Sequence, residues 1–193
     1  MKRIASGLAL VALALAAFPA SAQTTVTGFR AEFFAQQDGV EKHLLALAEA
    51  TPAEKFAWRP AEGVRSISEV YMHLVGANYM LPGFAGVKAP EGISPGMEKS
   101  VTEKTAVIAA MKKSFEHLRG AIAATKDADL DKPVKFFGME STVRGLYLTV
   151  ALHEHEHLGQ SIAYARMNGI VPPWTAERQA KAAKPAEKPA DKK

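Results

Sequence analysis

Residues 141–168 read STVRGLYLTVALHEHEHLGQSIAYARMN, and this stretch decides the fold. One line of side chains recurs through it at alternating spacings of three and four residues: Val143, Leu146, Val150, His153, His157, Gln160 and Tyr164. That spacing predicts an α-helix with one buried face. Because the first half of the line is apolar, the histidines that continue it are expected to lie in the protein interior. Gly169 and the Pro172-Pro173 pair predict where the helix ends.

Three earlier segments show the same periodicity and are predicted to be helices: 27–50, 66–84 and 102–125. Ser66 with Glu69, and Ser100 with Glu103, have the spacing of N-terminal capping boxes. A short extended piece is expected at 134–137, and no longer alternating strand pattern is found. The fold class predicted from these segments is all-α, a four-helix bundle whose middle connections are long enough to cross over.

The two ends of the chain have compositions unlike the body. Residues 1–22 have a basic start, an apolar run and the small-residue triplet Ala20-Ser21-Ala22, which is typical of a secretory signal peptide. The mature chain would then begin near Gln23 and be exported to the periplasm or the extracellular space. The alternative is an N-terminal membrane anchor, but no stop-transfer charges follow the triplet. Residues 177–193 are rich in Lys, Ala and Pro and are expected to form a disordered tail, which leaves 23–176 as the domain.

Charge and cysteine content exclude several functions. The formal net charge is +4, but the excess of basic residues lies in the first residues and in the tail, so the domain is not expected to bind nucleic acid. We likewise expect no membrane association after signal cleavage. The chain has no cysteine, which excludes disulfides, thiolate zinc sites, iron–sulfur clusters and a cysteine nucleophile. Histidine is then the remaining soft metal ligand.

Three histidines are predicted to line the interior. His153 and His157 are one helical turn apart and about 40° apart around the axis, which places their rings side by side. His73 takes an apolar position on the 66–84 helix. Three imidazoles from two helices would form a site with an open coordination position, as in catalytic zinc sites, although imidazole also suits nickel, iron and copper. His155 should point away from this site.

Other side chains are candidates for roles beside such a metal. Glu156 and Glu69 could each act as a base, although Glu69 also fits a capping box. Gln160 could orient a ligand or bond a histidine. The sequence argues against a di-iron carboxylate site, because only Glu154 and His157 have the required E-x-x-H spacing and Glu154 is poorly aligned with the histidine line. The remaining histidines, His43 and His117, are expected at the surface or rim.

The sequence around these histidines resembles the DinB/YfiT-like family. The resemblance rests on His73 within SISEVYMHLVGANYM, on the 58–66 loop WRPAEGVRS, and on HEHEHLGQSIAYARMNGIVPP, and it covers most of 27–174. It implies a metal-binding four-helix bundle with a divalent metal, commonly zinc or nickel, on His73, His153 and His157. Some members are transferases or isomerases that use small thiols, and these are cytoplasmic, so export puts a thiol cosubstrate in doubt here.

Two functions remain open from the sequence. The first is a metal-dependent enzyme, a hydrolase or a thiol-dependent transferase, with an unknown small-molecule substrate. The second is a non-catalytic metal-binding or small-ligand-binding protein of the cell envelope. A substrate pocket lined by Trp58, Tyr71 or Tyr147 would favour the enzyme, and a site closed by a fourth protein ligand would favour binding. A homodimer is compatible with either function.

Overall fold

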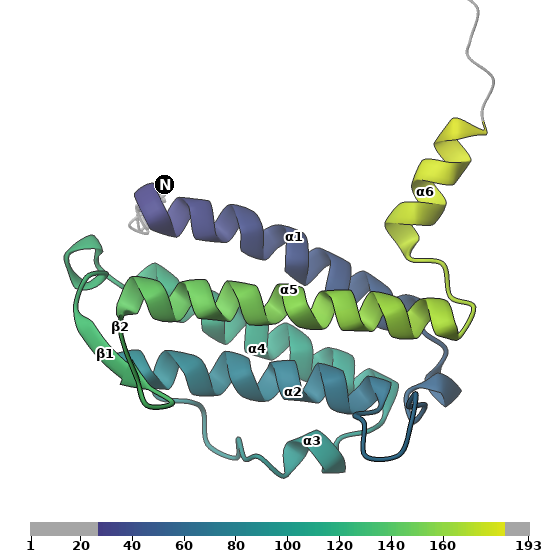
Figure 1. Cartoon of the computed structure of the whole chain (residues 1–193), viewed down its shortest axis with the longest axis horizontal. Helices are drawn as coiled ribbons and strands as arrows, with labels where there is room; N and C mark the ends of the chain where they lie inside the picture. Colours follow the sequence, from purple (N-terminus) through teal and green to yellow (C-terminus); the bar gives the residue numbers. More distant parts are fainter. Residues whose placement is uncertain (1–26, 184–193) are drawn as a thin grey trace, which may run out of the picture.

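The computed structural model describes residues 27–183, so the predicted signal peptide lies outside the described residues. Within this range the chain forms six α-helices and one two-stranded sheet, and Figure 1 shows their arrangement. The helices are α1 (Gly28–Ala50), α2 (Ile67–Met80), α3 (Met97–Ser100), α4 (Lys104–Ala124), α5 (Val143–Met167) and α6 (Pro173–Ala182). The strands are β1 (Pro133–Phe136) and β2 (Met139–Thr142), and short 3-10 turns lie at Ala53–Lys55, Leu81–Ala85 and Asp127–Asp129.

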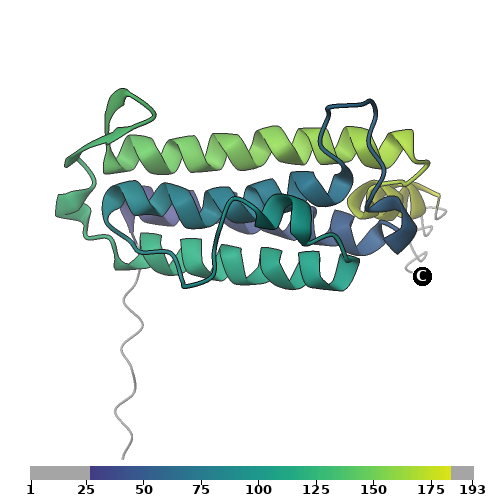
Figure 2. The same cartoon turned by 90° about the horizontal axis from the view of Figure 1, so that it is seen from below.

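The four long helices pack side by side. Helix α2 contacts α4 and α5, and α1 contacts the same two helices, which places α1 and α2 at opposite corners of the group. Each long helix occupies one of the segments predicted from periodicity. The sequence predicted four helices, and the described residues form two more (Figures 1 and 2). Helix α3 crosses below α2 in the connection to α4, and α6 follows α5. Both additional helices are too short to show a hydrophobic period in the sequence.

The two predicted capping boxes have different outcomes. Ser66 accepts a hydrogen bond from the backbone N–H of Glu69, and the Glu69 carboxylate accepts one from the backbone N–H of Ser66, so this prediction is confirmed. The Ser100–Glu103 box is wrong. Ser100 ends α3, and α4 begins at Lys104 with Glu103 as an N-cap that makes no side-chain hydrogen bond. The Lys104 ammonium instead donates to the carbonyls of Glu49 and Thr51 at the end of α1.

The extended piece expected at 134–137 is the first half of a hairpin. Strands β1 and β2 pair antiparallel, with Phe136 opposite Met139, so Phe137 and Gly138 form a two-residue turn. Both turn residues have positive φ, 49° for Phe137 and 81° for Gly138. Positive φ at both positions is the geometry of a type I′ turn, which favours Asn-Gly and disfavours a bulky first residue.

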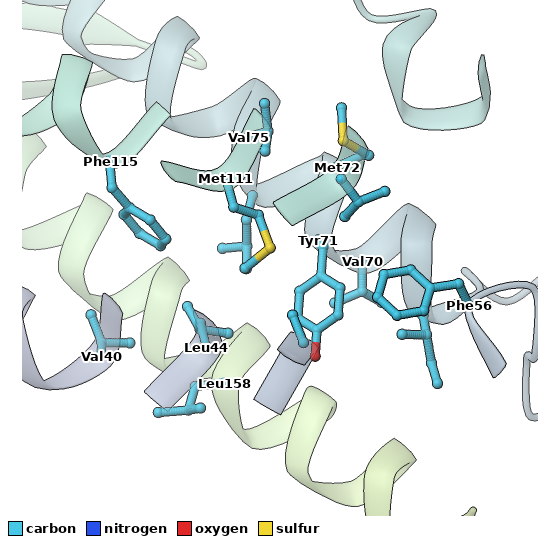
Figure 3. Packing of buried hydrophobic residues seen from close by; sticks show 14 of the residues in the cluster. Val40, Leu44, Phe56, Val70, Tyr71, Met72, Val75, Met111, Phe115 and Leu158 are labelled. Carbon is cyan, nitrogen blue, oxygen red and sulfur yellow. The ribbon is translucent and has the colours of Figure 1, made fainter. Parts of the chain in front are cut away.

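The hydrophobic core lies between the four long helices (Figure 3). Tyr71 on α2 packs with Phe56 at 6.1 Å between ring centroids, while Met111 and Phe115 on α4 close the same cluster. A second cluster at the hairpin end contains Phe33 and Tyr147. Both tyrosines are fully buried, so they build the core.

The C-terminal end of the described chain contains a helix, α6, that the sequence did not predict. Helix α5 ends before Gly169, whose φ is 73°. Pro173 takes the first position of α6, where a missing N–H costs nothing, so the proline pair marks the start of α6. The centroid of the Trp174 ring lies 4.2 Å from that of the His43 ring on α1, and this contact packs α6 against the bundle. Residues 177–182, which were expected in a disordered tail, are therefore helical. Within residues 27–183, no helix combines the length and apolar character that crossing a bilayer requires.

Candidate metal centre

Three histidine side chains meet between α2 and α5. His73 lies in the middle of α2, and His153 and His157 lie one turn apart on α5. The Nε2 atom of His153 is 3.0 Å from that of His73 and 3.1 Å from that of His157. The structure thus brings together the three residues that the sequence predicted as metal ligands, each offering one nitrogen.

The outer nitrogens of two of these rings have defined partners. The Nδ1 atom of His73 is 3.2 Å from a carboxylate oxygen of Glu98, and that of His157 is 2.8 Å from the amide oxygen of Gln160. Both partners accept hydrogen bonds, so each Nδ1 carries the proton and donates it. Gln160 in turn donates to the Tyr164 hydroxyl at 3.0 Å. The Nε2 atoms of His73 and His157 are left with lone pairs aimed at the shared point, as metal-bound histidines require.

The donor set fits a divalent metal. The Nε2 atom of His153 contacts the Nε2 atoms of both His73 and His157. A neutral His153 can donate a proton from this nitrogen to only one of them. Without a cation, the lone pair of His153 Nε2 or of its other neighbour therefore faces a second lone pair. The Nδ1 atom of His153 is buried and has no hydrogen-bond partner among the described residues. A cation bound by all three Nε2 atoms removes this conflict. Three imidazoles suit zinc and nickel and do not distinguish between them.

Burial favours the neutral, metal-binding form of His73 and His153. It lowers the pKa of His153 to about 4, with further lowering by the neighbouring His157 and His73. The pKa of His73 is lowered too, chiefly by burial. Burial alone would raise the pKa of Glu98, but the hydrogen bond and charge of Arg65 outweigh it and lower that pKa. A neutral His73 and a neutral His153 beside an ionised Glu98 are therefore expected at neutral pH.

A cavity of about 630 Å³ adjoins the histidines. It lies between α2, the 89–98 connection with α3, the hairpin turn and α5. His73, His153 and Glu98 form its polar end. The rest of the wall is mainly apolar and includes Met72, Val75, Tyr79, Ile93, Met97 and Phe137. The centre is thus open toward a space of the size that small-molecule sites have.

The two glutamates proposed as bases do not reach the histidines. Glu69 completes the capping box with Ser66 and makes an ion pair with Arg59 at 3.2 Å. Glu156 is exposed on α5 and does not line the cavity, because its angle around the helix turns it outward. Neither carboxylate lines the cavity or makes a hydrogen bond to a histidine among the described residues. Gln160, by contrast, contacts His157.

The aromatic residues expected around a pocket lie elsewhere. Tyr71 and Tyr147 are buried in the core, and Trp58 packs edge-on against Tyr164 with 5.4 Å between ring centroids. None of the three lines the cavity. Periodicity predicts on which face of a helix Tyr71 and Tyr147 lie, but it does not predict whether that face borders the cavity or the core. His155 points away from the metal site, as predicted: it is exposed, and its Nδ1 lies 2.8 Å from the carbonyl oxygen of Ala151.

Sequence reasoning missed the acidic partner of His73. Glu98 belongs to the four-residue helix α3 and is held by Arg65, whose Nε donates to it at 2.8 Å. The two residues are 33 positions apart, in connections before α2 and before α4. No local pattern marks such a contact, because it depends on how two loops pack over the helix between them.

Comparison with known proteins agrees with this architecture. A DinB-like protein from Bacillus cereus ATCC 10987 has a similar crystal structure, with a TM-score of 0.64, 20% identity, and coverage of 75% of this chain and 93% of that chain. A DinB-like protein from Bacillus subtilis gives a TM-score of 0.56, 21% identity, and coverage of 74% and 92%. No curated protein matches the sequence. The family model of the DinB superfamily matches residues 36–161. Because that match spans more than half of the chain, the protein belongs to the DinB superfamily, a metal-binding fold.

Proposed function

We propose that this protein is an exported divalent-metal enzyme, in which His73, His153 and His157 hold zinc or nickel beside a small-molecule pocket. The observation that carries the proposal is the convergence of three Nε2 atoms at the polar end of a cavity. A metal held there would act as a Lewis acid toward a ligand atom at its open position. Export rests on the signal-peptide pattern of residues 1–22.

The protein's own groups orient the site more than they move protons. Gln160 and Glu98 each fix one imidazole through its Nδ1–H. Among the described residues, Glu98 is the one carboxylate that lines the cavity, but it is engaged by Arg65 and by His73, which lower its pKa. Hydrolysis by general-base catalysis needs a group free to accept a proton, and Glu98 is not free in this way. The arrangement therefore favours group transfer at the metal over general-base hydrolysis. Because export argues against a thiol cosubstrate, a thiol is only a candidate donor, which the turnover assay tests.

Metal analysis of the purified mature protein, prepared without a polyhistidine tag, tests the metal site. We expect about one zinc or nickel ion per chain by mass spectrometry, consistent with one three-histidine site. The variants His73→Ala and His153→Ala should lose it, while His155→Ala, which removes an exposed histidine from the same helix, should retain it. Equal metal content in His73→Ala and the unaltered protein would refute the assignment.

A non-catalytic binding role is the second candidate. It is favoured because Glu98, the carboxylate that the described residues bring to the cavity, is engaged by Arg65 and His73. The two roles differ in turnover. In a substitution assay, a small thiol displaces the chloride of 1-chloro-2,4-dinitrobenzene, which forms the thioether and releases chloride and a proton. This reaction, followed by absorbance, should be accelerated by the metal-loaded protein and not by His153→Ala. A rate equal to the protein-free background, from protein shown to be fully loaded, would favour the binding role.

A further inference from the structure

The cavity beside the histidines has two ends of unlike chemistry. Its polar end is formed by His73, His153 and Glu98, and Ser94 and Thr149 add two hydroxyls. The remaining wall is built mainly from apolar side chains, three of them methionines: Met72, Met80 and Met97. An unbranched methionine side chain adapts to irregular apolar partners. A ligand that matches this space must itself be divided into a polar head and an apolar body.

The mouth of the cavity gives a second, independent observation. Phe137, which lines the cavity, sits at the first turn position of the hairpin with φ of 49° and is 64% exposed. A bulky side chain is disfavoured at that φ, and Asn is the residue that such a turn prefers. Its ring lies near those of Phe84 and Phe136, at centroid distances of 5.4 and 6.0 Å. The turn therefore carries a conformational cost to place an exposed aromatic ring at the cavity mouth.

We propose that the ligand of this site is a small amphiphile, whose alkyl or aryl group fills the cavity beneath Phe137 while its polar head reaches His73 and His153. The role of the head rests on the proposed metal function, but the apolar part depends only on the cavity. Burying each methylene group in such a space strengthens binding about fourfold when the burial is complete. Affinity should accordingly rise with the length of an unbranched chain until the cavity is filled.

The test uses alkan-1-ols, because they carry the apolar part without a metal-chelating head. Butan-1-ol, hexan-1-ol and octan-1-ol are titrated into protein with ¹³C-labelled methionine methyl groups, both metal-loaded and treated with chelator. Shifts are expected at Met72, Met80 and Met97 in both forms, with affinity rising at each step. Met111, buried in the core, and Met167, exposed at the end of α5, serve as internal controls.

Two substitutions separate the cavity from the fold. A Cβ at Gly76 meets no atom within 4 Å, and Gly76 lines the cavity, so Gly76→Leu should fill it without a clash near the backbone. Gly159→Leu is the matched control, since Gly159 is exposed on α5 and equally unobstructed. We expect Gly76→Leu to lose at least tenfold in octan-1-ol affinity with its metal content unchanged, and Gly159→Leu to bind normally.

Phe137→Asn addresses the mouth. It gives the turn its preferred residue, so the thermal midpoint should not fall, while octan-1-ol binding should weaken several-fold. Chain-length-independent binding, or shifts confined to Met111 and Met167, would overturn the inference. So would a Phe137→Asn variant that changes the oligomeric state but not alcohol binding, because the ring would then belong to an interface between copies. If the purified protein binds no metal at the three histidines but its alcohol affinity still rises with chain length, only the metal assignment is refuted.

Discussion

Two polar clusters lie inside this helical protein, and they meet at consecutive residues of α5. The histidine cluster (His73, His153 and His157) opens onto the cavity. The Glu154 cluster takes one side chain from each long helix and is nearly or fully buried: Gln37, Asn78, Ser114 and Glu154. One residue step turns the side chain by about 100°, so His153 and Glu154 face different spaces.

The clusters differ in how their polar atoms are matched. In the histidine cluster the outer nitrogens of His73 and His157 have acceptors, and the inner nitrogens converge. In the Glu154 cluster, Gln37 donates to Glu154 at 3.1 Å, yet the second Glu154 oxygen and the Gln37 amide oxygen have no partner among the described residues. Burial raises the pKa of Glu154 to about 8. Convergence toward an open space indicates ligand binding, whereas enclosed polar contacts between four helices indicate a structural role.

The largest expected effect separates the clusters by their response to metal. With zinc or nickel at a thousand times its dissociation constant, the metal should stabilise the fold by about 4 kcal/mol. His153→Ala should abolish this increment in denaturant unfolding measured with and without metal. Glu154→Gln, a near-isosteric change at the next residue, should keep it. If His153→Ala retained the increment, the two clusters would not differ in the way proposed.

The next effect concerns the fold itself. Glu154→Ala leaves the Gln37 amide without its acceptor and opens a small void between α1 and α5, which should cost about 2 kcal/mol of unfolding free energy. Metal content per folded chain should not change. Denaturant midpoints and metal analysis on the same samples measure both quantities. A variant of unaltered stability that had lost its metal would move Glu154 into the metal site.

A smaller effect is expected from the residues that orient the histidines. Glu98→Ala removes the acceptor of the His73 Nδ1–H and should weaken metal affinity about tenfold, as loss of such partners does in other sites. Gln160→Ala should act similarly through His157. Competition with a chromophoric chelator measures both. An affinity unchanged in both variants would mean that the imidazoles are fixed by packing alone.

The parts of the fold and of the metal site that could be predicted are those that depend on residues close together in the sequence. The long helices and the histidine triad were predicted because a period of 3.6 residues places side chains on one face, and the His153 and His157 positions continue an apolar line. Helices α3 and α6 and the second strand were not, since each is only a few residues long or depends on tertiary contacts such as that of Trp174 with His43.

The acidic residues show the same limit more sharply. Glu69 lies one helical turn before His73, and Glu156 lies about 60° around α5 from His153. Such positions on a helix do not tell which element covers that face. Glu98 was missed because its position depends on Arg65, 33 residues away, and on the packing of two connections. A local pattern therefore indicates which side chains share a helix face, and long-range packing decides which of them meet.

The smallest expected effect tests whether Glu69 belongs to the capping box alone. Ser66→Ala should cost about 1 kcal/mol through loss of the cap. The backbone N–H of Ser66 and then the Arg59 charge lower the pKa of Glu69 below its usual 4.5. A carboxyl whose pKa is lowered by folding stabilises the protein above that usual value, and its contribution is lost as the pH falls through the lowered pKa.

Glu69→Gln can still accept the Ser66 N–H bond, so stability at neutral pH should change by only a few tenths of a kcal/mol. What should disappear is Glu69's part of the stability loss in acid, measured by urea unfolding at a series of pH values. Metal content at neutral pH should equal that of the unaltered protein, in contrast to Glu98→Ala. A metal loss in Glu69→Gln would return this carboxylate to the histidine cluster and remove the distinction between a glutamate that caps α2 and one that orients its histidine.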